Sequence, residues 1–125
     1  MLQIPGLYIG ETKDKGRGVF AGIPINKDDT IEVCPIIIIP KAELPIIHRT
    51  HLHDYYFLWG EKLEECCIAL GYGSLYNHEL HPNANFLLDL LENTIVIEAI
   101  KDIDAGEEIT INYHGEPGEG EKLWF

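Results

Sequence analysis

The sequence predicts a mostly β protein with one or two short helical turns. Its 125 residues are one domain's worth of chain, and 46 % of them are hydrophobic, which is enough for a core. Short runs rich in β-branched residues are separated by Gly, Pro, Asn and Asp, a pattern typical of strands joined by turns. The sequence contains no internal repeat and no long amphipathic stretch. We therefore expect residues 1–125 to form a single domain.

In the first third of the chain, two short strands and one longer strand are expected. Residues 7–9 and 19–21 flank a polar loop at residues 11–18. Residues 30–39 are rich in β-branched side chains and form the longer strand. Pro35 lies inside this run and has no N–H to donate, so we expect part of the strand to lie at a sheet edge or a bulge.

The remaining elements follow from alternation and turn residues. Residues 44–59 are compatible with a strand or a short helix, because their aromatic residues suit either. Residues 86–91 and 94–100 predict a hairpin, and residues 109–113 predict a last strand. Residues 114–120 are rich in Gly and Glu and are expected to form a loop. In the second hairpin strand, one face should carry Ile95, Ile97 and Ala99, and the other Val96, Glu98 and Ile100.

The charge of the chain limits its partners. It has 9 Lys and Arg residues against 21 Asp and Glu residues, a formal net charge of −12 at pH 7. Such a chain repels phosphate backbones and attracts basic protein segments, although the charge can also serve solubility alone. No apolar run is long enough to cross a membrane, and no signal peptide is recognisable. Three cysteines, an odd number, give no disulfide framework, so a reducing compartment such as the cytoplasm is expected.

Three segments carry residue types that point to chemistry. Residues 15–20 read Lys-Gly-Arg-Gly-Val-Phe, and their glycines allow backbone N–H groups to approach a ligand. Residues 76–83 read Tyr-Asn-His-Glu-Leu-His-Pro-Asn, a cluster of donors and acceptors with a rigid turn. Residues 106–113 read Gly-Glu-Glu-Ile-Thr-Ile-Asn-Tyr. Each segment taken alone is also compatible with an ordinary turn, a capped loop or a packed tyrosine.

In this order and spacing, the three segments resemble the SET-domain protein lysine methyltransferases, and most closely the minimal viral-type SET proteins. The resemblance covers residues 8–113 and implies a SET-domain, β-clip-like fold with a knot-like C-terminal segment. It also implies S-adenosylmethionine as the cofactor and Tyr113 as the catalytic residue, placed where methyl donor and lysine meet. His78 would serve binding and not proton transfer. The cofactor-binding residues implied are Gly16, Arg17, Gly18, Asn77, His78 and Trp124, the last within a C-terminal lid at residues 114–125.

The expected substrate channel is aromatic and apolar. The candidates for its aromatic wall are Tyr55, Tyr56, Tyr72, Phe86 and Tyr113. The resemblance itself places Phe86 and Ile111 along the channel. Bringing a lysine with a free pKa of about 10.4 to its neutral form at pH 7 costs about 4.6 kcal/mol. An apolar channel beside a cationic sulfonium lowers that pKa by desolvation and by repulsion between like charges. Phe86 and Ile111 stand where some monomethylating relatives carry a tyrosine hydroxyl, so di- or trimethylation is expected.

The sequence departs from the family pattern in three places, and it leaves alternatives open. A Tyr-x-Gly is absent at residues 33–35, Glu79-Leu80 replaces the usual Ser-Cys, and no Cys-rich zinc module is present. One alternative is an inactive SET-like module that binds basic peptides. A zinc site is disfavoured because the spacing of its candidate ligands is unfamiliar, and no metal is expected. Those candidates are His48, His51, His53, Cys66 and Cys67. An acidic docking patch would comprise Glu107, Glu108, Glu116, Glu119 and Glu121.

The expected partner is a basic protein, such as a histone tail, a prokaryotic DNA-packing protein or a ribosomal protein. No direct nucleic-acid or membrane partner is expected. Analogy with the small viral relatives suggests a homodimer. The expected location is the cytoplasm, or the nucleus if the host is a eukaryote and the substrate is a histone.

Overall fold

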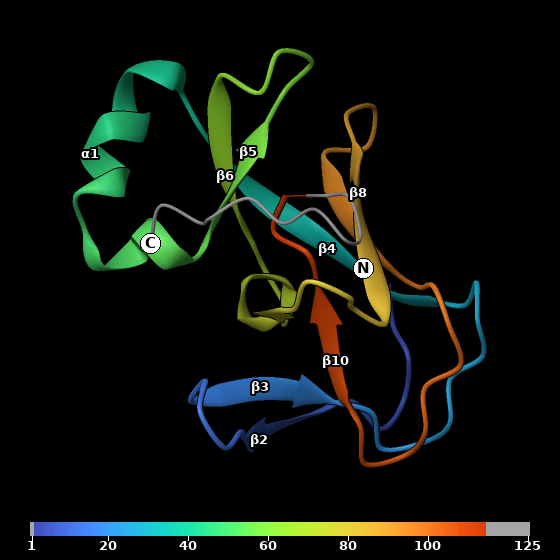
Figure 1. Ribbon diagram of the computed structural model, residues 1–125. Coiled ribbons are helices and arrows are strands. Elements are labelled where there is room, and N and C mark those ends of the chain that lie inside the picture. Colours follow the sequence, from blue (N-terminus) through green and yellow to red (C-terminus); the bar gives the residue numbers. More distant parts are fainter. Residues whose placement is uncertain (1, 115–125) are drawn as a thin grey trace.

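Two β-sheets make up the computed structural model, which describes residues 2–114 (Figure 1). The larger sheet has β4 near its centre and runs in the order β5, β6, β4, β9, β8, with β1 paired to β4. The smaller sheet runs β2, β3, β10, β7. The strands of the larger sheet are β1 (Leu2–Gln3), β4 (Thr30–Ile39), β5 (Tyr56–Trp59), β6 (Glu65–Ala69), β8 (Ala84–Asp89) and β9 (Thr94–Ala99). Those of the smaller sheet are β2 (Tyr8–Glu11), β3 (Arg17–Phe20), β7 (Asn77–His78) and β10 (Glu108–Ile111).

Strand β4 changes its partner at Pro35. It pairs with β9 as far as Pro35, and from Ile36 to Ile39 it pairs with β6. A residue without an N–H suits such a changeover, because the ladder on one side ends there. The interruption expected at Pro35 is therefore a change of pairing from β9 to β6. The irregularity in register lies earlier in β4, between Thr30 and Glu32.

The ambiguous segment at residues 44–59 contains both kinds of structure. A 3-10 turn, η1 (Lys41–Glu43), leads into α1 (Leu44–His48), and a second turn, η2 (His51–Asp54), precedes β5. A proline in the first turn of α1 is compatible with a helix start, since the N–H it lacks would have no partner there. The hydroxyl of Thr50 accepts a hydrogen bond from the N–H of Leu52 at 3.1 Å and caps η2. Figure 1 shows these short helices beside β5 and β6.

The predicted hairpin is confirmed as β8 and β9, although its first strand lies two residues earlier than expected. The carboxylate of Asp89 accepts from the N–H of Glu92 at 3.1 Å, so the turn begins before residue 91. Asn93 has a φ of +54° in this turn, a conformation that asparagine tolerates. Along β9, burial alternates as predicted, with Ile95, Ile97 and Ala99 fully buried.

The other strands also differ from prediction at their ends. Strand β10 ends at Ile111 instead of residue 113, because the side chain of Asn112 accepts a hydrogen bond from the N–H of His114 at 2.9 Å. Strands β2 and β3 each extend further into the predicted loop than expected, so the loop between them is shorter than predicted. The N–H of Thr12 donates to the carbonyl of Gly16 at 2.7 Å and closes this loop.

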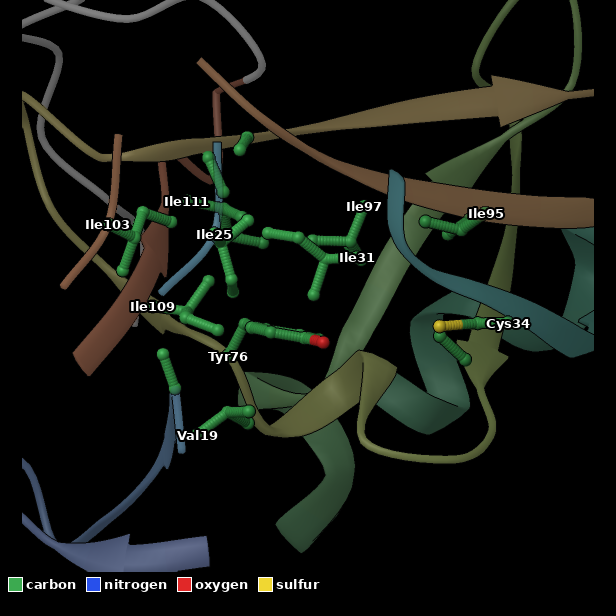
Figure 2. Close-up of a cluster of buried hydrophobic side chains, with 14 of the residues drawn as sticks. Val19, Ile25, Ile31, Cys34, Tyr76, Ile95, Ile97, Ile103, Ile109 and Ile111 are labelled. Carbon is green, nitrogen blue, oxygen red and sulfur yellow. The ribbon is translucent and has the colours of Figure 1, made fainter. Parts of the chain in front are cut away.

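The core lies between the two sheets. Figure 2 shows Val19, Ile109 and Ile111 of the smaller sheet on one side of Tyr76, and Ile31 and Cys34 of the larger sheet on the other. All of these side chains are at most 1 % exposed. Removing this apolar surface from water is the main term that stabilises the fold. Among residues 2–114, none of the helices is both long and apolar enough to cross a bilayer.

Candidate active site

Strand β7 brings two of the three predicted segments together. It runs parallel to β10, with Asn77 opposite Thr110 and His78 opposite Ile111. Beyond the strand ends, the N–H of Glu79 donates to the carbonyl of Ile111 at 2.9 Å. Residues more than 30 positions apart in the chain therefore meet in one ladder. The knot-like segment that the resemblance implies after Tyr113 lies, apart from His114, outside the described residues.

Asn83 connects the loop after β7 to the main chain of β10. Its amide nitrogen donates to the carbonyl of Glu108 at 2.8 Å, and its amide oxygen accepts from the N–H of Thr110 at 2.9 Å. The side chain is 8 % exposed, so both ends of the amide are paired away from bulk water. The Asn83 side chain thus forms the hydrogen bonds to the β10 main chain that a neighbouring strand would otherwise form, and it holds the loop in place.

Tyr113 is held at two points directly after β10. Its hydroxyl donates to the carbonyl of Tyr76 at 2.8 Å, and its backbone N–H donates to Nδ1 of His78 at 3.0 Å. The rings of Tyr113 and His78 lie 5.1 Å apart. Burial, followed by the nearby Asp54 carboxylate, raises the pKa of Tyr113 to about 12. The phenol therefore keeps its proton at neutral pH and remains a hydrogen-bond donor.

Gly18 allows β3 to lie against the Asn77 side chain. A Cβ at Gly18 would lie 2.4 Å from Oε2 of Glu108 and 2.9 Å from Nδ2 of Asn77. That Nδ2 donates to the carbonyl of Arg17 at 2.9 Å and to Oε2 of Glu108 at 2.7 Å. Gly18 therefore serves the close approach of three segments. Gly16 differs: it has a φ of +71°, and the space beside it is open.

A cleft of about 940 Å³ opens between the loop that carries Gly16, the turn η3 (Gly73–Leu75), β7 and the end of η2. Its charged side chains have both signs. Lys15 connects two sides of the cleft, because its Nζ donates to the carbonyl of His78 at 3.1 Å and pairs with the carboxylate of Glu79. The cleft is lined by Glu11, Asp14, Lys15, Gly16, Arg17, Asp54, Tyr55, Ser74, Leu75, Asn77, His78 and Tyr113.

The cleft gathers part of the predicted site. Gly16, Arg17, Asn77, His78, Tyr55 and Tyr113 line it, while Gly18, Tyr72, Phe86 and Ile111 are not among its lining residues. Ile111 is fully buried in the core, and Phe86 packs against Phe57 with ring centres 5.0 Å apart. Tyr72 packs against the core and donates its N–H to Glu32 at 3.0 Å. Trp124 and the expected lid, apart from His114, lie outside the described residues.

Sequence reasoning assigned no role to several residues of the site. Lys15 and Asp54 each stand next to a residue that was chosen, so proximity in the chain was the available signal. Glu79 was noted only as a departure from the family pattern, and its ion pair with Lys15 gives that departure a role. Glu32 is a lone acidic residue inside a β-branched run, and this unusual pattern is the available signal for it.

The side chains considered for zinc do not converge. Within residues 2–114, no three His, Cys, Asp or Glu side chains are grouped so that they could hold a metal ion. His48 hydrogen-bonds the hydroxyl of Tyr56 at 2.9 Å, and His53 pairs with Asp54 at 2.9 Å. Cys66 and Cys67 are buried in β6, and burial raises the pKa of the Cys67 thiol to about 12. Such a thiol is a poor metal ligand at neutral pH.

Comparison with known proteins agrees with this geometry. The SET domain family matches residues 16–114. A Schizosaccharomyces pombe protein, named as a histone-lysine N-methyltransferase specific for lysine 37 of histone H3, is 37 % identical over 120 residues, which cover 95 % of this chain and 76 % of the relative. The crystal structure of a Plasmodium falciparum protein, provisionally assigned as a histone methyltransferase, aligns over the whole of both chains with a TM-score of 0.74 and 31 % identity.

The chain therefore belongs to the SET-domain family. It is a protein-lysine methyltransferase of that family, as the three motifs predicted. The mostly β, SET-type fold is confirmed as well. SET-domain methyltransferases generally use S-adenosylmethionine as the methyl donor.

Proposed function

We propose that the cleft holds S-adenosylmethionine and that the chain methylates a lysine of a histone. The observation that carries this proposal is the fixed position of Tyr113, whose hydroxyl and N–H are both hydrogen-bonded at the cleft wall. The choice of a histone is supported by the naming of the S. pombe relative and by the net charge of −12, which attracts basic segments. A histone substrate implies a nuclear location in a eukaryotic host.

The residues of the cleft fit this cofactor. A volume of about 940 Å³ lies within the usual range for cofactor sites. Lys15 and Arg17 offer positive charge for a carboxylate, while Glu11, Asp14 and Asp54 offer negative charge for an ammonium and a sulfonium. The cofactor carries all three of these charged groups. When bound, it supplies an electrophilic methyl group on a positively charged sulfur.

The cofactor would be bound by Gly16, Asn77 and His78. Gly16 would contribute mainly through its backbone. The φ of +71° at Gly16 and the open space beside it leave its backbone accessible from the cleft. Both hydrogens of the Asn77 amide are already engaged with Arg17 and Glu108, so that side chain orients the loop as well as lining the cleft. We expect His78 to contribute by binding, since its Nδ1 is occupied by the N–H of Tyr113.

Tyr113 and Tyr55 would receive the lysine. Aromatic faces hold an ammonium or methylammonium group. A phenol that donates one hydrogen bond still has lone pairs, so the Tyr113 hydroxyl can accept a hydrogen bond from the amine while donating to Tyr76. A phenol with the ordinary pKa of about 10 is already protonated at neutral pH, and the raised pKa of about 12 extends this to more alkaline solution. Exclusion of water would favour the neutral amine, whose formation costs about 4.6 kcal/mol in solution.

The test is methyl transfer from labelled S-adenosylmethionine to a panel of basic proteins that includes histone H3 and an H3 peptide around lysine 37. We expect transfer to histone by the unmodified chain, and loss of transfer in Tyr113→Phe and His78→Ala. Cofactor binding should weaken mainly in His78→Ala. Tyr8→Phe is the matched control, because Tyr8 stacks on Phe20 and does not line the cleft.

Three outcomes would count against the proposal. Full turnover by both Tyr113→Phe and His78→Ala would contradict the assigned site. Transfer to ribosomal or DNA-packing proteins but not to histone would contradict the assigned substrate. Binding of basic peptides without any transfer would favour the inactive module instead.

A further inference from the structure

Glu32 is a fully buried carboxylate in the apolar core. It lies on β4 and is 0 % exposed, with the Cys34 thiol beside it, and it accepts hydrogen bonds from three N–H and O–H groups. The hydroxyl of Tyr76 donates to Oε1 at 2.8 Å, and the N–H of Tyr72 and Nε2 of Gln3 donate to Oε2 at 3.0 and 2.9 Å. Burying a carboxylate is costly unless such donors compensate for lost water. A residue kept here under that cost is a candidate for a specific role.

Two of the three donors lie at the two ends of one turn. Tyr72 immediately precedes η3 (Gly73–Leu75), and Tyr76 immediately follows it. The turn is pressed onto the larger sheet, because a Cβ at Gly73 would lie 2.5 Å from Cβ of Ala69 and 2.9 Å from Sγ of Cys34. Glu32 therefore holds both ends of η3 against β4. Figure 2 shows the hydroxyl oxygen of Tyr76 pointing toward the side of the core where Ile31 and Cys34 of β4 lie.

The same turn carries the acceptor for Tyr113. The carbonyl of Tyr76 receives the hydrogen bond from the Tyr113 hydroxyl at 2.8 Å. The next two residues are Asn77 and His78, which form β7 and line the cleft. The phenol of Tyr76 thus contacts Glu32, while its main chain contacts Tyr113. Burial and the adjacent Glu32 raise the pKa of the Tyr76 phenol, which keeps it a donor.

We propose that Glu32 is a positioning residue for the methyl-transfer site: through Tyr72 and Tyr76 it fixes the carbonyl that orients the Tyr113 hydroxyl. The inference rests on the proposed role of Tyr113 in the cleft. Glu32 touches neither cofactor nor substrate in this scheme. Its loss should therefore lower kcat more than it raises KM, because alignment of the acceptor and donor atoms dominates an in-line transfer.

The experiment compares three substitutions, one at Glu32 and one at each of two residues that donate hydrogen bonds to it. Glu32→Gln keeps the shape but replaces an acceptor by an NH₂ group. Tyr76→Phe is the milder variant and removes one donor from the turn. Gln3→Met removes one donor of the same carboxylate from β1, away from the turn, and is the matched control. We expect kcat to fall about tenfold in Glu32→Gln and severalfold in Tyr76→Phe, and to stay within twofold in Gln3→Met.

A second measurement does not depend on turnover. In protein carrying ¹³C at the tyrosine ring carbon that bears the hydroxyl, the Tyr113 resonance should move in Glu32→Gln and Tyr76→Phe and stay in place in Gln3→Met. The inference is overturned if Glu32→Gln and Gln3→Met lower the melting temperature alike, while kcat and the Tyr113 resonance are unchanged. If the unmodified chain transfers no methyl group, the proposed function fails, and the resonance still tests the positioning role.

Discussion

The hydroxyl of Tyr113 donates a hydrogen bond to the main-chain carbonyl of Tyr76 at 2.8 Å, across 37 positions of sequence. This bond joins Tyr113, two positions after the end of β10, to the residue before β7, and the backbone N–H of Tyr113 adds a second bond, to His78. Tyr113 is thus fixed to the segment that contains β7, which the parallel pairing with β10 brings alongside it. The position of its hydroxyl depends on how that junction is held.

Lys15 is expected to strengthen cofactor binding by tying the glycine-containing loop to β7. Its Nζ donates to the carbonyl of His78 and pairs with Glu79. Because the pair is partly exposed, its loss should raise the dissociation constant for S-adenosylhomocysteine by about three- to fivefold. The increase should be larger at low salt than at high salt. Isothermal titration calorimetry of Lys15→Met measures this. Lys41→Met breaks the exposed pair with Glu64 and should leave the affinity unchanged; equal effects in both variants would contradict the role of Lys15.

Gly18→Ala should destabilise the fold more than Gly16→Ala. The added Cβ at Gly18 would meet side-chain atoms of Glu108, Asn77 and Thr12 at 3.0 Å or less, so the hydrogen-bonded Glu108 and Asn77 side chains would have to leave their present positions. We expect a loss of about 1–3 kcal/mol in the free energy of unfolding. At Gly16 the space is open and only the φ of +71° is unfavourable, at about 1 kcal/mol. Urea denaturation of the two variants measures both values, and an equal or reversed order would show that the contact at Gly18 is relieved without cost.

Stability should fall in mild acid because of His78. Burial, and then the neighbouring His114, lower the pKa of His78, although Glu79 opposes the shift. The folded state therefore favours the neutral ring, whose Nδ1 accepts from the N–H of Tyr113. This contribution to stability is present above the unfolded pKa of about 6.5 and is lost as pH falls through the lowered folded value. The melting temperature between pH 8 and pH 5 should fall less steeply in His78→Gln than in the unmodified chain. His81→Gln, at an exposed site, should keep the original slope.

The reaction is expected to proceed beyond one methyl group. Phe86 and Ile111 present no hydroxyl, and Phe86 packs edge-on against Phe57. Neither residue lines the cleft, so these positions offer no hydroxyl that would hold a methylated amine in a monomethyl arrangement. Mass spectrometry of a saturated reaction should show di- or trimethyllysine. A saturated reaction of the unmodified chain that stops at one methyl group would contradict this expectation.

The sequence patterns predicted three of the six strands described in the larger sheet, namely β4, β8 and β9. Alternation in residues 94–100 correctly separated the buried from the half-buried face of β9, because one side of an antiparallel strand faces the core. Residues 44–59 could not be resolved, since their aromatic residues pack equally well in a strand or a turn. The ends of β8 and β10 were misplaced because side-chain caps from Asp89 and Asn112 stop the ladders, and local hydrophobicity does not report such caps.

The candidate site was predictable only where a motif carried it. The family resemblance placed Gly16, Asn77, His78 and Tyr113 in one site, and the structure brings these four around one cleft. Phe86 and Ile111 were chosen by position in the motif, but their side chains point into packed regions. The contact of Glu32 with the turn at residues 72–76 spans 40 positions or more, and no short pattern encodes it.

The most direct test is to locate the cofactor by tyrosine resonances, without reference to turnover. Protein labelled with ¹³C in its tyrosine rings is titrated with S-adenosylhomocysteine, and calorimetry confirms binding. We predict that the resonances of Tyr113 and Tyr55, which line the cleft, shift on saturation, while that of Tyr8 stays in place. Binding that leaves Tyr113 and Tyr55 unmoved would show that the methyl donor sits elsewhere and would contradict the assignment of this cleft.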